Sequence, residues 1–67
     1  MRQEIINVLK KHFEAHIAKH KMNVDIMLNN PMALHDYTDL MDAIEKEVNQ
    51  ISDYKDKIKV MEKYFKE

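Results

Sequence analysis

Cysteine and glycine are absent from this 67-residue sequence, and proline, serine and threonine occur once each, at Pro31, Ser52 and Thr38. Without cysteine the chain can form neither disulfides nor thiolate metal sites. Without glycine it has no phosphate-binding glycine loop and lacks the glycine-containing turns that strand-rich domains need. Residues with a low helix cost, such as Lys, Glu, Met, Leu and Ala, are abundant instead, so the sequence predicts an all-α fold.

Excess charge of one sign and long apolar runs are also missing. The formal net charge is −1, so no overall field attracts nucleic acid or anionic lipid. No apolar run approaches the roughly 18 residues that a membrane-spanning helix requires. The stretch from Met1 to Ile6 lacks the apolar block of a signal peptide. We therefore expect a cytoplasmic protein with no membrane contact.

The first half of the chain carries a helical apolar pattern. Its steps of three and four residues average about 3.5, the period of a helix that packs along a single neighbour. The pattern ends near Asn30, where Pro31 disfavours helical backbone geometry. The sequence therefore predicts a helix over residues 2–29, whose packing face consists of Ile6, Leu9, Phe13, Ile17, His20, Val24 and Met27.

The second half predicts another helix, over residues 37–66, after a turn at residues 30–37. Its apolar series is Leu40, Ile44, Val48, Ile51, Ile58, Met61 and Phe65. We expect one domain, residues 1–67, in which the two helices form an antiparallel hairpin. Folding them together should pair residues whose numbers sum to about 68. This register places His20 against Val48 and Leu28 against Leu40.

A second apolar stripe lies on another side of the first helix. Val8, Ala15 and Met22 follow one another at seven-residue steps, and Ile26 lies beside Met22. One neighbouring helix cannot cover both stripes. Short chains without a disulfide or a metal usually need a partner. We therefore expect a homodimer that forms a four-helix bundle, with these four residues in its interface and no cofactor.

Three histidines form the most distinctive polar pattern. His12, His16 and His20 are spaced four residues apart and share one ridge of the first helix. Two imidazoles at this spacing can chelate a divalent transition metal, so the three are candidate metal ligands. The ligand set is incomplete, because Glu14 points to another face. We favour a structural role, with His20 buried and hydrogen-bonded and His12 nearer to solvent.

The sequence offers little for catalysis. Ser52 and Thr38 stand outside any nucleophile motif, and the carboxylates of the second helix alternate with lysines, as on a solvated face. We therefore predict that the protein is not an enzyme and has no catalytic residues.

A basic and aromatic segment near the C-terminus suggests an alternative function, nucleic-acid binding. Interleaved acidic residues dilute its charge, so nucleic acid is not the partner we favour. The segment, called the basic–aromatic segment below, comprises Tyr54, Lys55, Lys57, Lys59, Lys63, Tyr64, Phe65 and Lys66.

Several short stretches along most of the chain form a distinctive series. They are His16-Ile17-Ala18-Lys19-His20-Lys21, Asn23-Val24, Leu28, Asn30-Pro31, Asp39-Leu40, Asp42-Ala43-Ile44-Glu45, Ile58, Val60 and Glu62-Lys63-Tyr64-Phe65. In this order they resemble small uncharacterised proteins of marine T4-like bacteriophages. The phage proteins contain glycine after the proline, whereas this chain has Met32-Ala33-Leu34-His35. The resemblance implies a phage origin and a host cytoplasmic setting, and it implies no activity. The two apolar stripes of the first helix, the lack of a disulfide or metal and the missing catalytic groups lead us to expect a non-catalytic helical module for self-association and protein–protein interaction.

Overall fold

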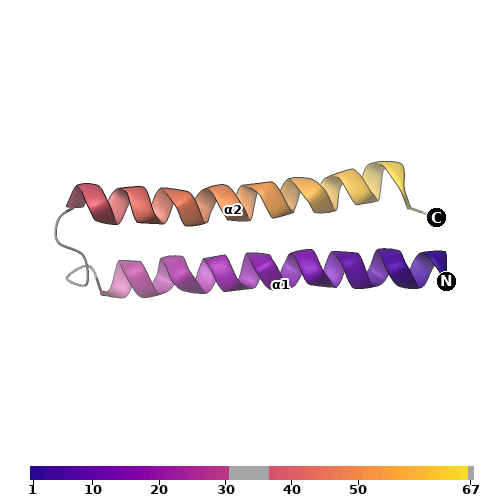
Figure 1. Cartoon of the computed structure of the whole chain (residues 1–67), viewed down its shortest axis with the longest axis horizontal. Coiled ribbons are helices and arrows are strands. Elements are labelled where there is room, and N and C mark those ends of the chain that lie inside the picture. Colours follow the sequence, from indigo (N-terminus) through magenta and orange to yellow (C-terminus); the bar gives the residue numbers. More distant parts are fainter. Residues whose placement is uncertain (31–36, 67) are drawn as a thin grey trace.

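The computed structural model describes residues 1–30 and 37–66, and over these ranges the chain forms two α-helices and no strand. Helix α1 spans Arg2–Asn29 and helix α2 spans Tyr37–Tyr64 (Figure 1). The helices lie side by side in opposite directions, so the two termini meet at one end (Figure 1). The predicted all-α helical hairpin is thus confirmed. The expected turn lies largely outside the described residues, and α2 ends two residues before its expected limit.

Side chains satisfy backbone groups at the ends of the helices. At the end of α1, the Asn30 side-chain amide donates a hydrogen bond to the Ile26 carbonyl at 3.1 Å. At the other end of the hairpin, Arg2 Nη2 donates to the Phe65 carbonyl at 3.3 Å. The last carbonyls of a helix have no partner within it, so each contact satisfies a group that would otherwise depend on water. The second contact also ties the start of α1 to the residue after α2.

The register between the helices lies within one residue of the prediction. Three cross-helix contacts join residues whose numbers add to 67: Arg2 with Phe65, Phe13 with Tyr54, and His20 with Glu47. Two of the predicted pairs are nevertheless wrong.

Val48 is 48% exposed, so it does not cover His20, and Leu28 is 60% exposed rather than packed on Leu40. Successive helical residues differ by about 100° around the axis, so a small rotation of α2 turns Glu47 inward and Val48 outward.

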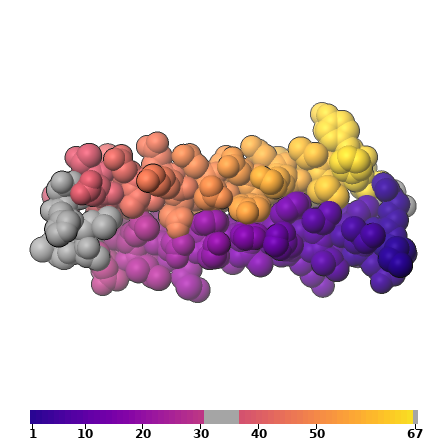
Figure 2. Space-filling view, viewed as in Figure 1, coloured from indigo at the N-terminus to yellow at the C-terminus, as the bar shows by residue number. Residues whose placement is uncertain are grey.

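The core between the two helices is thin. Among the described apolar residues only Ile6 and Leu40 are buried, at 7% and 9% exposure. The molecule measures 49 × 15 × 11 Å, a rod one helix thick and two helices wide (Figure 2). Each helix has a single neighbour, so most inward-facing side chains are only half-buried. This geometry leaves little apolar surface protected from water.

Candidate functional site

A polar cluster, called the clasp below, joins the two helices near the middle of the rod. Its members are His20 and Asn23 on α1 and Glu47 on α2. His20 Nδ1 lies 2.9 Å from Glu47 Oε2, and the Asn23 side-chain amide donates to Glu47 Oε1. An ionised carboxylate only accepts hydrogen bonds, so His20 donates to it through Nδ1–H. His20 is 9% exposed, which confirms the prediction of a buried histidine at this position.

The clasp keeps Glu47 ionised between the helices. The hydrogen bond from His20, followed by that from Asn23, lowers the pKa of Glu47 below its ordinary value, and Lys19 adds a smaller effect in the same direction. Hydrogen bonds to the charged form of a carboxyl group favour that form. Over the described residues, every buried side-chain nitrogen and oxygen has a hydrogen-bond partner. The clasp is therefore a self-satisfied polar contact rather than a site open to a ligand.

Aromatic rings continue the contact toward the termini. The His16 and Tyr54 rings are nearly parallel, at 5° and a centroid distance of 4.5 Å, and Phe13 lies 6.0 Å from Tyr54. Lys57 Nζ is 5.0 Å from the centre of the same tyrosine ring. Partial burial lowers the pKa of His16, and the charges of His12, Lys19 and His20 lower it further. Near neutral pH the stack therefore contains an uncharged imidazole.

The three candidate metal ligands lie in one row but engage different neighbours. His12 is exposed and its ring meets that of His16 edge-on, at a centroid distance of 4.6 Å. His16 stacks on Tyr54, and His20 is bound to Glu47. In the part of the chain that the structure describes, no three His, Cys, Asp or Glu side chains are placed to hold a metal ion. His16 and His20 thus contact α2, whereas the ring contacts of His12 are with Phe13 and His16 of α1 itself.

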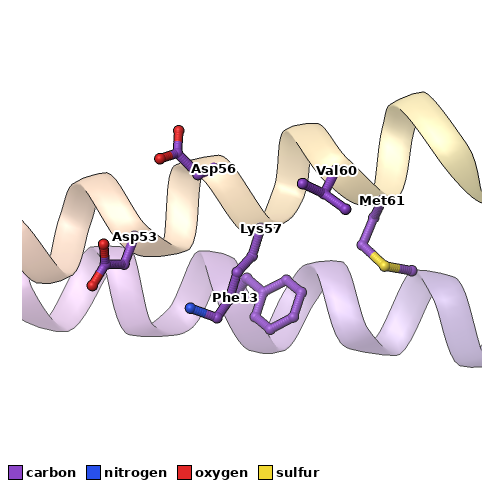
Figure 3. A pocket seen from close by; sticks show the side chains of 6 residues that line it. All are labelled: Phe13, Asp53, Asp56, Lys57, Val60 and Met61. Atoms are coloured by element: carbon purple, nitrogen blue, oxygen red, sulfur yellow. The ribbon is translucent and has the colours of Figure 1, made fainter.

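A groove beside the aromatic rings combines apolar and charged side chains. It has a volume of about 390 Å³ and is lined by Phe13, Asp53, Asp56, Lys57, Val60 and Met61. Figure 3 shows Met61 pointing toward α1 and the Asp56 carboxylate pointing away from it. The two aspartates therefore do not converge on a common point in the groove. The arrangement does not assemble an acid–base pair or a charged pocket.

The basic–aromatic segment is divided by the fold. The Tyr54 ring stacks on the His16 ring of the other helix, whereas the Tyr64 and Phe65 side chains are 65% and 45% exposed. Lys63 Nζ lies 5.3 Å from the Tyr64 ring centre. A single-strand binding surface needs several rings along one basic groove. Here Tyr54 faces the other helix, so the rings of the segment do not share one surface.

An apolar strip, called the α1 strip below, covers a side of α1 that α2 does not reach. It consists of Ile5, Val8, Ala15, Met22 and Ile26. Val8 and Met22 are 66% and 64% exposed, and Ile5 and Ile26 are each 54% exposed. Ile5 was not part of the predicted stripe, although its spacing of three residues before Val8 was the available signal. Next to it lies an open groove of about 440 Å³, lined by Met1, Glu4, Ile5, Val8, Leu9 and His12.

The clasp joins the two helices, and the α1 strip is left exposed along one side of them.

Over residues 1–30 and 37–66, neither helix is both long and apolar enough to cross a membrane. Comparison with protein-family models, with curated proteins and with solved structures finds no match to this chain.

Proposed function

We propose that this protein is a non-catalytic helical module that forms a homodimer and serves as a protein–protein interaction unit. The observation that supports the proposal is the α1 strip. Four of its members are large apolar side chains, each more than half exposed, on a helix whose other face is already covered by α2. A row of this kind at helical spacing is typical of a surface that packs on another helix.

The thin core is the energetic reason for association. Covering apolar surface contributes about 2.5 kcal/mol for every 100 Å² removed from water. A hairpin with two buried apolar residues gains little of this on its own. Packing of the α1 strip against a second copy would extend the core along the whole rod, and a four-helix bundle is the closed arrangement of two such hairpins.

The polar residues support a structural rather than a catalytic role. His20, Asn23 and Glu47 converge, but they satisfy one another in the contact between the helices. A catalytic site would present such groups to a cavity that admits a substrate. Ser52 and Thr38 are exposed on α2, and neither belongs to the clasp. We therefore assign the clasp to the fold and the α1 strip to the function.

The proposed setting is the cytoplasm of an infected bacterium. The resemblance to small phage proteins supports it, and the partner beyond the second copy would be a phage or host protein.

Sedimentation equilibrium at micromolar concentration tests the proposal. We expect twice the chain mass for the natural protein and the single-chain mass for Met22→Glu, because the charge would be forced into an apolar contact. Ser52→Glu, which adds the same charge at an exposed position of α2, should remain dimeric.

A fully helical natural protein that sediments as a monomer would refute self-association. Retention of the natural protein on single-stranded DNA, weakening steeply with salt, would replace the proposal with the nucleic-acid alternative.

A further inference from the structure

The α1 strip has nearly the same order of side-chain sizes in both directions from Ala15. We propose that it pairs with the α1 strip of a second copy in antiparallel orientation, with Ala15 on the two-fold axis. This inference rests on the proposed dimer and specifies which helices meet and how they are aligned.

The spacing of the strip makes it self-complementary. Val8 and Met22 each lie seven residues from Ala15, while Ile5 precedes it by ten residues and Ile26 follows it by eleven. In a two-fold interface, if one residue contacts a second on the partner, the second contacts the first in return. The antiparallel alignment thus places Val8 on the partner's Met22 and Ile5 on the partner's Ile26, and each pair occurs twice.

Ala15 suits the centre of such an interface. Its exposed methyl group is the smallest side chain of the strip, and the larger ones lie symmetrically on either side. Helix axes approach to about 8–10 Å depending on the side chains at the crossing, so a central alanine permits the closer end of this range. Steps of three and four residues along the strip match a left-handed seam between two helices.

Two polar residues complete the seam and favour the antiparallel orientation. His12 and Lys19 occupy the remaining positions between Val8 and Ala15 and between Ala15 and Met22. A parallel pair would set Lys19 directly against the partner's Lys19, with two ammonium groups facing each other. The antiparallel pair sets Lys19 against the partner's His12 instead, so the two Lys19 ammonium groups are kept apart.

The groove at the start of α1 fits the same alignment. It lies beside Ile5 and Val8, where the partner's Ile26 and Met22 would arrive. The strip from Ile5 to Ile26 is about 32 Å long at 1.5 Å per residue. A standard interface buries roughly 800 Å² per partner, and groove residues such as Met1 and Leu9 would extend the contact beyond the strip itself.

Helix α2 is a weaker candidate for the central contact. Its exposed apolar residues Tyr37, Met41 and Val48 lie in its first half, and Val60 and Tyr64 lie near its end. Lys46 lies within the first group, between Met41 and Val48, and Asp53 and Lys57 lie between the two groups. The exposed apolar residues of α2 therefore do not form a continuous row about a central small residue.

Single cysteines provide the test, because the chain has none of its own. Each variant is oxidised with diamide at micromolar concentration, and the products are separated on a non-reducing gel and identified by mass. We expect Ala15→Cys to link to itself. We also expect a mixture of Val8→Cys and Met22→Cys to link to each other about a hundredfold faster than Ser52→Cys links to itself. Residues held in contact have millimolar effective concentrations, whereas the chains are micromolar.

Other linkage patterns would overturn the alignment. Rapid self-linkage of Val8→Cys or Met22→Cys would show a parallel pair, and rapid self-linkage of Met41→Cys would place α2 at the interface. If Ala15→Cys alters the fold, as circular dichroism would reveal, the Val8 and Met22 mixture decides. A dimeric mass with either contrary pattern refutes this alignment alone. A monomeric mass refutes the proposed function as well.

Discussion

Replacing His20 by leucine measures what the clasp contributes to stability. From the sequence alone the change should keep the fold and preserve or raise its stability. The apolar pattern places Val48, which cannot hydrogen-bond through its side chain, beside His20, and a buried imidazole costs free energy unless it is hydrogen-bonded. The structure reverses the expected sign, since His20 Nδ1 is 2.9 Å from Glu47. A hydrogen bond to a charged group contributes about 1.5–3 kcal/mol.

Two features place the expected loss for His20→Leu below that range. Glu47 keeps its hydrogen bond from Asn23, and its side chain is 16% exposed, so water can replace part of the lost contact. Leucine also retains most of the buried volume at this position. We expect the free energy of unfolding to fall by about 1 kcal/mol. For a chain of this size that corresponds to a decrease of about 4–8 °C in Tm.

Urea unfolding followed by circular dichroism provides the measurement, at one fixed protein concentration because association shifts apparent stability. His20→Ala should cost about 1–2 kcal/mol more than His20→Leu, because the apolar burial is lost as well. Lys21→Ala, an exposed neighbour, serves as the control. An increase in stability for His20→Leu would show that the clasp costs more free energy than it returns and would refute this reasoning.

Three further predictions follow from burial and from the pKa shifts. Acidification should destabilise the hairpin, because folding lowers the pKa values of His16 and Glu47 and the unfolded chain therefore binds protons more readily. Stability should begin to fall near pH 6.5, the ordinary pKa of His16, and fall again near pH 4.5, the ordinary pKa of Glu47. A urea midpoint that stays constant from neutral to acidic pH would contradict this. Leu40→Ala should lower the free energy of unfolding in urea by about 2–3 kcal/mol, because Leu40 is 9% exposed. Leu28→Ala should lower it by under about 1 kcal/mol, because Leu28 is 60% exposed. Equal losses of stability would mean that the packing face of the helices is misassigned. Tyr54→Ala should raise the pKa of His16 in an NMR titration, because the ring that partly buries the imidazole is removed, while Tyr54→Phe should leave it unchanged.

The helices themselves could be predicted from local signals. The apolar steps of three and four residues, the absence of glycine and the single Pro31 fix where helical geometry can begin and end. Helix α1 spans Arg2–Asn29, which matches the predicted residues 2–29. These signals lie within one segment of chain, so they do not depend on how the helices dock.

The clasp could not be predicted, because it depends on the rotation of one helix against the other. Apolar character alone selects Val48 as the neighbour of His20, and Glu47 is the adjacent residue. The pairing becomes visible only when His20 and Asn23, three residues apart on α1, are seen to face the same carboxylate. The available signal was a carboxylate opposite two hydrogen-bond donors. A prediction based on apolar residues alone does not detect such a signal.

The clasp also restricts how the two helices can slide along each other. An apolar seam tolerates a shift of one helical turn, because one Leu or Ile replaces another at little cost. Glu47 discriminates between such alignments: a shift of one turn toward the end of α1 would move its carboxylate from the donors of His20 and Asn23 toward Val24 and Met27. A shift of one turn the other way would bring it to His16 but remove the amide of Asn23. A buried carboxylate without partners is strongly unfavourable. We infer that this polar contact selects a single alignment of the rod, a role that holds even if its net contribution to stability is small.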